Sequence, residues 1–165
     1  MAHTRERTIQ WEDPFARPEL LVGRSGLELL QAIVDGEIPP PPMAMVMNSR
    51  LVEVEHGRAV FEGEAGEEHY NPSGVVHGGY AMTLLDSALG CAVHSTLPAG
   101  ALFGTIDVHV RLLRAITKDT GMLRCEAKVV SLSRTLGTSE ARITDRSGNL
   151  LATGTTACAI RLPSP

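Results

Sequence analysis

Apolar and polar positions follow two different periods along the chain, and each change of period marks a new element. Residues 26–34 carry apolar side chains at helical spacing, and Ser25 stands where a helix N-cap is expected. A run of four prolines at 39–42 must end this helix and is expected to form a stiff connector. The preceding residues, 1–24, show neither period and are predicted to form an irregular arm.

Two segments after the proline run alternate with the period of a β-strand. In 51–55, Val52 and Val54 alternate with glutamates, and 58–65 repeats the pattern. The two residues between the segments include a glycine and suit a turn. The pattern therefore predicts a hairpin with one apolar and one acidic face.

Residues 80–94 have a helical pattern that is apolar almost all round, which is typical of a buried helix. Strand patterns return after it, at 105–112, 123–129, 138–144 and 150–161. In the first of these strands Ile106 and Val108 belong to the apolar face, and Thr105 belongs to the polar face.

The order of elements is one helix, two strands, one buried helix and four strands. This order predicts an α+β fold in which a mostly antiparallel sheet packs around one long central helix. Such a sheet covers one face of the helix, so we expect a second subunit to cover the other. Residues 25–161 are predicted to form a single domain.

Composition narrows the function classes. The chain has 165 residues, of which 43% are hydrophobic and 21% charged, and this excludes a disordered or fibrous protein. Its net charge of -4 argues against a general nucleic-acid binder. The N-terminus lacks the apolar stretch of a secretory signal, and no segment reaches the roughly 18 apolar residues of a membrane span. We expect a cytoplasmic protein with no membrane or nucleic-acid partner.

The cysteines and histidines do not have the spacing of a metal site. The three cysteines (Cys91, Cys125 and Cys158) are far apart and are interpreted as small buried residues in a reducing compartment. Four histidines (His56, His69, His94 and His109) are interpreted as surface or loop residues, and no metal is expected.

The segment with the strongest chemical signal is Asn71-Pro-Ser-Gly-Val-Val-His77-Gly78-Gly79, directly before the buried helix. The first N–H groups of a helix have no partner within it, and the helix dipole adds partial positive charge there. Two glycines allow close approach of a ligand, so this helix start could serve as an oxyanion hole. A tight loop-to-helix junction without chemistry is the alternative.

Asp86 lies in the middle of the apolar helix, where a carboxylate is costly unless it is paired or used. Its alternatives are an exposed position or an aspartate held by a neighbouring hydroxyl. Nine residues separate it from His77, about 13 Å along the helix axis, so the two cannot serve one reacting carbonyl within one helix. If both are catalytic, the site combines the helix start of one subunit with Asp86 of another, which predicts a homodimer.

These motifs, over about residues 43–161, resemble the hotdog-fold acyl-CoA thioesterases, in particular the branch like phenylacetate-pathway thioesterases. The resemblance implies that Asp86 is the catalytic carboxylate and that the Gly78 N–H polarises the thioester carbonyl. It also implies that Asn71 is a site residue, that His77 shapes the helix start, and that the Thr105 hydroxyl helps to hold water.

The resemblance further implies an acyl-CoA substrate, with coenzyme A as part of the substrate and no separate cofactor. It places the pantetheine arm near 131–136, which includes Arg134 and Thr135. Arg134 and Arg114 are the best candidates for the coenzyme A phosphates, because the chain is locally basic there. Gly79 and Tyr80, at the helix start, are expected to contact the acyl group.

Several alternatives stay open at this stage. An enoyl-thioester hydratase or dehydratase and a non-catalytic acyl-CoA-binding protein share the same fold. Asp86 could act as a general base or as a nucleophile. The family also implies that the homodimer can double into a homotetramer.

Overall fold

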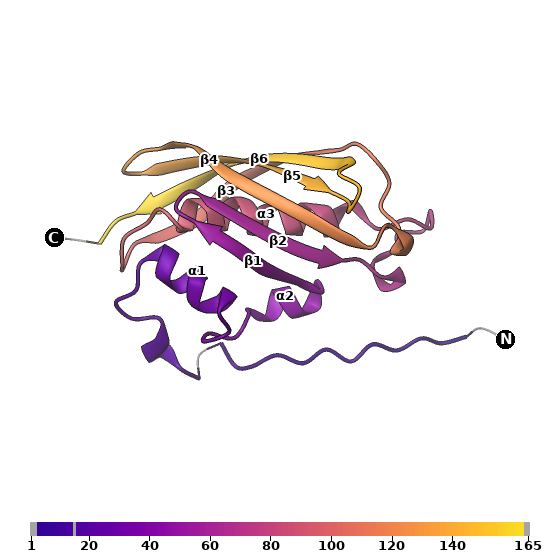
Figure 1. Cartoon of the computed structure of the whole chain (residues 1–165), viewed down its shortest axis with the longest axis horizontal. Helices are drawn as coiled ribbons and strands as arrows, with labels where there is room; N and C mark the ends of the chain where they lie inside the picture. The colour runs from indigo at the N-terminus through magenta and orange to yellow at the C-terminus, as the bar shows by residue number, and fades with distance from the viewer. Residues whose placement is uncertain (1–2, 15, 164–165) are drawn as a thin grey trace.

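The computed structural model describes residues 3–14 and 16–163. Six antiparallel strands form one sheet in the order β1-β2-β4-β5-β6-β3 (Figure 1). The strands are β1 (Ser49–Glu55), β2 (Arg58–Glu64), β3 (Leu102–Leu112), β4 (Met122–Leu132), β5 (Leu136–Thr144) and β6 (Leu150–Arg161). The helices are α1 (Gly26–Val34), α2 (Pro42–Val46) and α3 (Gly78–His94), with short 3-10 turns η1 (Pro18–Leu20), η2 (Glu67–His69) and η3 (Lys118–Thr120).

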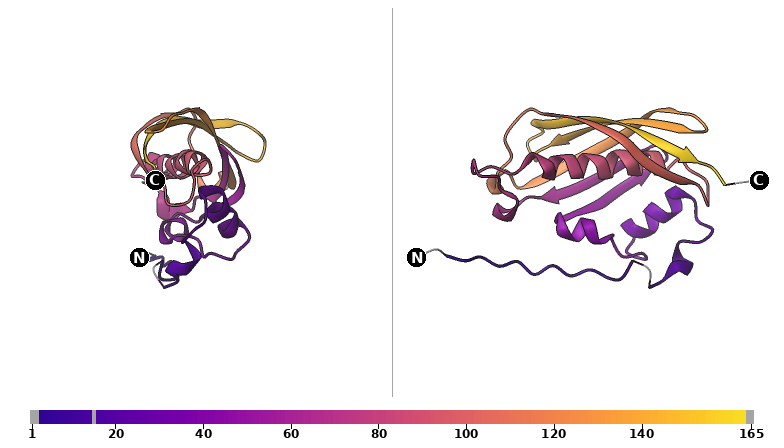
Figure 2. Two further views of the ribbon diagram at one scale, coloured as in Figure 1. Left: turned by 90° about the vertical axis from the view of Figure 1, so that its left-hand side faces the viewer. Right: turned by 180° about the vertical axis from the view of Figure 1, so that it is seen from behind.

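The sheet arches over α3, which runs along its concave face (Figure 2). Leu84, Leu85 and Leu89 of α3 are at most 2% exposed and form the core with apolar residues of β2, β4, β5 and β6. The predicted antiparallel sheet around one long buried helix is confirmed, as is the order of the longer elements. The opposite side of α3 is less covered, since Met82, next to the core residues, remains 45% exposed.

The segments before the sheet agree with the sequence-based prediction, except at the proline run. Ser25 caps α1 as predicted, because its side chain accepts from the Glu28 N–H while the Glu28 carboxylate accepts from the Ser25 N–H. The proline run was expected to be only a connector, but its last residue begins α2. Proline is well suited to this first helical position, where its missing N–H costs nothing.

Bulges change the predicted side-chain alternation in two strands. In β1 the register shifts between Leu51 and Glu53, so Leu51 and Val54 are buried and Val52 is not. In β3 the register shifts between Thr105 and Asp107. The predicted apolar face of β3 is therefore wrong at Ile106, which is 60% exposed.

The acidic face predicted for the β1–β2 hairpin is neutralised by arginines. Arg58 contacts Glu53, Glu55 and Glu126, and Arg124 contacts Glu53 at 2.6 Å. The Arg58 guanidinium holds the pKa of Glu126 below its ordinary value. The hairpin surface is therefore a charge-balanced network rather than an acidic patch.

The N-terminal arm is tied to the turn that precedes α3. Arg5 forms an ion pair with Glu67, and Arg7 forms one with Glu68 at 3.0 Å. Arg7 also donates to the carbonyl of Met45 in α2. The arm runs alongside α2 as an extended segment (Figure 1).

Candidate active site

The loop before α3 is shaped by the side chain of Asn71. Its Oδ1 accepts from the N–H of Ser73 at 2.9 Å and from the N–H of Val75 at 3.4 Å. Gly74 has φ of 78°, a left-handed conformation that glycine adopts without strain. The Asn71 side-chain oxygen is therefore used inside the loop.

His77 caps the N-terminus of α3. Its Nδ1 accepts from the Gly79 N–H at 2.9 Å, which assigns the ring proton to Nε2. The His77 N–H in turn donates to the carbonyl of His69 at 2.8 Å. No residue that the structure describes accepts a hydrogen bond from the Gly78 N–H, so this donor is available to a ligand.

A pocket of about 260 Å³ opens beside this donor. Asn71, His77, Gly78 and Arg114 all line it, and residues 112–116 form the facing wall. A Cβ on Gly78 would lie 2.6 Å from Leu112, so glycine keeps the pocket open there. The structure thus brings four of the sequence-predicted site residues to one pocket.

Asp86 and Thr105 form a second group, farther along α3. The Thr105 hydroxyl donates to Asp86 Oδ1 at 2.9 Å. Asp86 is partly exposed and Thr105 is exposed, so the carboxylate keeps access to the open side of the molecule. Eight residues, or about 12 Å of helix, separate Gly78 from Asp86. One chain therefore holds both groups but does not bring them together.

The charge of Asp86 acts on the nearby thiol of Cys91, but this thiol is poorly suited to act as a nucleophile. Burial, with the charge of Asp86 as a smaller contribution, raises the pKa of the Cys91 thiol to about 12. A thiol with this pKa is protonated at neutral pH, and the thiolate is the reactive form. Asp86 is therefore the better candidate for the chemical step.

Tyr80 is placed in the core rather than at the pocket wall. Its side chain is 4% exposed, and its ring packs against His69 with centroids 4.8 Å apart. Its hydroxyl has no hydrogen-bond partner among the described residues. Burial raises the pKa of Tyr80 to about 12. Within one chain, Tyr80 does not reach the pocket.

Arg134 and Thr135 lie at the opposite end of α3. The turn between β4 and β5 carries them, and the Thr135 carbonyl accepts from the N–H of Ile160. This turn and the loop before α3 lie at opposite ends of the sheet (Figure 1). Arg134 can join Arg114 in one site only if two chains contribute.

His94 differs from its sequence-based interpretation as a surface or loop residue, whereas His69 does lie in the loop before α3. His69 accepts a hydrogen bond from the Gly66 N–H and supports the loop before α3 through its carbonyl. His94 stacks on Phe103 with centroids 4.7 Å apart, and burial lowers its pKa. Neither is a simple surface residue.

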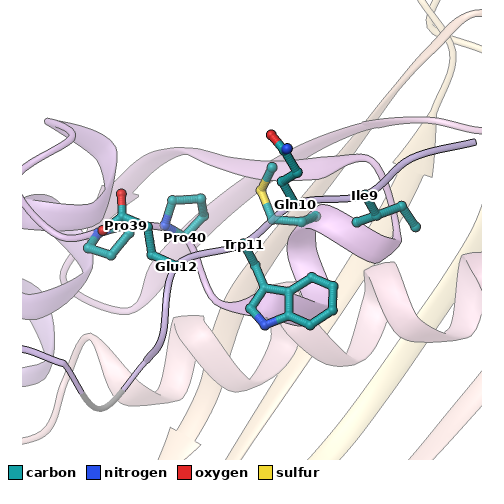
Figure 3. Close-up of a pocket in the computed structure, with 7 residues that line it drawn as sticks. Ile9, Gln10, Trp11, Glu12, Pro39 and Pro40 are labelled. Atoms are coloured by element: carbon teal, nitrogen blue, oxygen red, sulfur yellow. The ribbon is translucent and has the colours of Figure 1, made fainter.

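A larger pocket of about 630 Å³ lies between the arm and the proline run. Figure 3 shows Trp11 and the rings of Pro39 and Pro40 along it. None of the sequence-predicted site residues line this pocket, so we place the chemistry elsewhere. Among the described residues no group of three or more His, Cys, Asp or Glu side chains is arranged to hold a metal ion, and no helix has the length and apolar character to cross a membrane.

Comparison with known proteins shows similarity to one family. Residues 73–152 match the model of the thioesterase superfamily. The matched segment is just under half of the chain. The sheet wrapped around α3 is the hotdog fold, and the matched segment includes the candidate site residues of both groups except Asn71.

Individual relatives agree with this assignment. A 1,4-dihydroxy-2-naphthoyl-CoA hydrolase of Listeria monocytogenes is 29% identical over 61% of this chain and 80% of its own length. A phenylacetic acid degradation-related protein of Ralstonia eutropha superposes with a TM-score of 0.72 at 26% identity, over 79% of this chain and 98% of that one. A candidate esterase of Halobacterium salinarum is 43% identical over 44% of this chain, and this chain spans about half (47%) of its length.

Sequence reasoning missed the residues that support the site from outside the motif. The Val76 N–H donates to the Ile116 carbonyl at 2.9 Å, and His69 accepts from His77. Both contacts use main-chain carbonyls, which any residue supplies, so no residue type could have revealed them. Leu112 was predicted as a strand residue, but its contact with Gly78 depends on the sheet closing over α3.

Proposed function

We propose that the protein is an acyl-CoA thioesterase that works as a homodimer. The Gly78 N–H of one subunit would bind the thioester oxygen, and Asp86 of the other would act on the carbonyl carbon or on water. One observation carries the proposal. The unused Gly78 N–H and the accessible Asp86 carboxylate both belong to α3, but within one chain they are too far apart to act on the same carbonyl. The named activities of the hydrolase and thioesterase relatives support the same reaction class.

The open side of the molecule supports the dimer. β3 is an edge strand, and Leu102, Ile106 and Leu112 on it are 63%, 60% and 50% exposed. An unpaired apolar edge strand favours association with another chain. Asp86 and Thr105 lie on this same side, so a second copy related by a twofold axis would set its α3 antiparallel to the first. Arg114 and Arg134 would then supply positive charge for the coenzyme A phosphates from different subunits. Two such dimers would further associate into a tetramer.

The activity is tested by thiol release from a panel of acyl-CoA and arylacyl-CoA thioesters. Wild-type protein should hydrolyse at least one of them, and Asp86→Asn should reduce turnover by about 10³-fold or more while keeping the fold. Crotonyl-CoA hydration is measured in parallel, because hydration without thiol release would point to the hydratase alternative. Tight binding without turnover would point to an acyl-CoA-binding protein.

Mixing two inactive variants tests whether the site is shared. Gly78→Ala fills the pocket beside Leu112, and Asp86→Asn removes the carboxylate. In a mixed dimer one site keeps both groups intact, so random pairing should restore about a quarter of wild-type activity. No restoration after subunit exchange would mean that both groups act within one chain.

A single turnover in heavy-oxygen water separates the two roles of Asp86. Direct attack by the carboxylate breaks the thioester C–S bond, releases the coenzyme A thiolate and forms a mixed anhydride. Hydrolysis of this anhydride by water at the protein carbonyl leaves label in Asp86. General-base catalysis puts the label only into the released acid.

A further inference from the structure

The bulge in β3 decides which way Thr105 points. Val108 and Val110 pack against the core, so strict alternation would put Ile106 inside and Thr105 outside. The register instead pairs Thr105 with Cys158 and Asp107 with Ala157, which leaves Ile106 as one extra residue. This extra residue reverses the alternation, so that Thr105 points toward α3 and reaches Asp86.

Phe103, two residues before Thr105, has its side chain on the same side of the strand as Thr105. Phe103 stacks on His94 of α3, and its ring lies 3.4 Å from where a Cβ on Gly90 would be. Phe103 and Thr105 therefore face α3 on one side of the bulge, while Val108 and Val110 face the core on the other. Without the bulge, either this pair or the valines would have to turn outward.

Two side chains hold the bulge in place. The Asp107 carboxylate accepts from the N–H of Ala157 at 3.1 Å, across the strand pair. The Thr156 hydroxyl, on a residue that is 4% exposed, donates to the main-chain carbonyl of Asp107. Asp107 is thus bound through both its main chain and its side chain, directly next to the extra residue.

We propose that Asp107 and Thr156 are positioning residues, which lock the β3 bulge and thereby direct the Thr105 hydroxyl onto Asp86. This inference rests on the proposed function, since it assigns the lock a role in the activity of Asp86. Neither residue lines the pocket beside Gly78. Their effect reaches the reaction only through Thr105.

The test compares variants that differ in one hydrogen-bonding group. Asp107→Ala removes the acceptor for Ala157, whereas Asp107→Asn keeps an oxygen at the same place. Asp107→Ala should lower kcat about tenfold with KM within about twofold, and Asp107→Asn should restore most of kcat. Thr156→Val and Thr156→Ser form a second matched pair, with the loss expected only for valine. Asp35→Ala, a change at the C-cap of α1 and away from β3, should leave kcat unchanged.

A double-mutant cycle distinguishes positioning from a general loss of stability. In a Thr105→Val background there is no hydroxyl to direct, so Asp107→Ala should have little further effect on kcat. Additive losses, or equal losses for Asp107→Asn and Asp107→Ala, would overturn the proposal.

A crystal structure of Asp107→Ala provides a readout that does not depend on activity. We expect Thr105 Oγ1 to have moved beyond hydrogen-bonding distance of Asp86. If the bulge and this hydrogen bond persist unchanged, the lock is wrong even when the enzyme is a thioesterase. A wild-type protein that releases no thiol, with the bulge opened in the variant, would instead refute the proposed function and leave the structural lock standing.

Discussion

Replacing Tyr80 with phenylalanine should stabilise the protein, because the tyrosine hydroxyl is buried without a partner. The side chain is 4% exposed, and no described residue bonds its oxygen. A buried polar group without a hydrogen bond costs about 1–3 kcal/mol, and phenylalanine fills the same ring volume without a cavity. We expect the free energy of unfolding to rise by about 1–2 kcal/mol, which corresponds to a rise in Tm of roughly 2–8 °C for a chain of this size.

Gly63, which lies next to the Tyr80 hydroxyl, provides a control for the predicted gain in the free energy of unfolding. A Cβ at Gly63 would lie 2.8 Å from the Tyr80 hydroxyl and 3.3 Å from the Ser49 Cβ. Gly63→Ala should therefore destabilise wild-type protein by about 1–3 kcal/mol, and by clearly less in the Tyr80→Phe background, where only the contact with Ser49 remains.

Urea unfolding at one fixed protein concentration measures all four proteins, since self-association makes stability depend on concentration. A Tyr80→Phe variant that is equally or less stable than wild type would show that the hydroxyl is satisfied. The Michaelis constant should not change, because Tyr80 does not line the pocket. A large change in KM would restore the sequence-based assignment of Tyr80 to substrate binding.

Three further predictions concern the helix start, the hairpin and the end of α3. Gly79→Ala places a Cβ 2.9 Å from His77 Nδ1, so it should weaken the N-cap by about 1 kcal/mol and lower thiol release. Unchanged Tm and turnover would contradict this role. Arg58→Gln removes the partner of Glu53 and Glu126 and should cost about 1–2 kcal/mol, with a smaller loss at high salt. The pKa of Glu126 is depressed in the folded protein, so its ionised carboxylate stabilises the fold above about pH 4.5, and this stabilisation is lost as the pH falls. Arg58→Gln should therefore make the free energy of unfolding, measured in urea, less dependent on pH in the acid range. Burial lowers the pKa of His94, so the unfolded chain takes up a proton first and stability should fall as the pH drops below about 6.5. His94→Gln should reduce the change in the free energy of unfolding between about pH 7 and 5. If this change is the same in the variant, it comes from groups other than His94.

The sequence predicted the elements well where one face is buried and the other is not. The alternation of β5 was predicted correctly, and so was the buried, all-round apolar α3, since hydrophobic burial imposes its period on the side chains. α2 was not predicted, because a five-residue helix that begins at Pro42 is too short to show a period. The arm contacts of Arg7 were also beyond prediction, since long-range ion pairs leave no local pattern.

The candidate site was predictable as a set of residues but not as an arrangement. Asn71, His77 and Gly78 are close in sequence, so a short loop is enough to bring them to one pocket. Arg114 reaches the same pocket only because the end of β3 returns to the start of α3. Arg134 was predicted for the same ligand, yet it lies at the far end of α3, and a single chain offers no pattern that would reveal this distance.

The conflict at Thr105 was itself a signal for the bulge. Alternation in 105–112 assigned Thr105 to the polar face, while the resemblance assigned its hydroxyl to the site on α3. The structure resolves the conflict with an extra residue, Ile106, between Thr105 and Val108, which turns Thr105 toward α3 although Val108 also faces inward. Deleting Ile106 leaves Thr105 opposite Cys158 and Asp107 opposite Ala157 with no extra residue between them. Thr105 should therefore still face Asp86, and kcat should stay well above that of Thr105→Val while circular dichroism shows a folded protein. Because Ile106 is 60% exposed, its removal leaves no cavity in the core of the described chain. A folded deletion variant whose kcat falls to the level of Thr105→Val would show that the register of β3 does not set the direction of the hydroxyl.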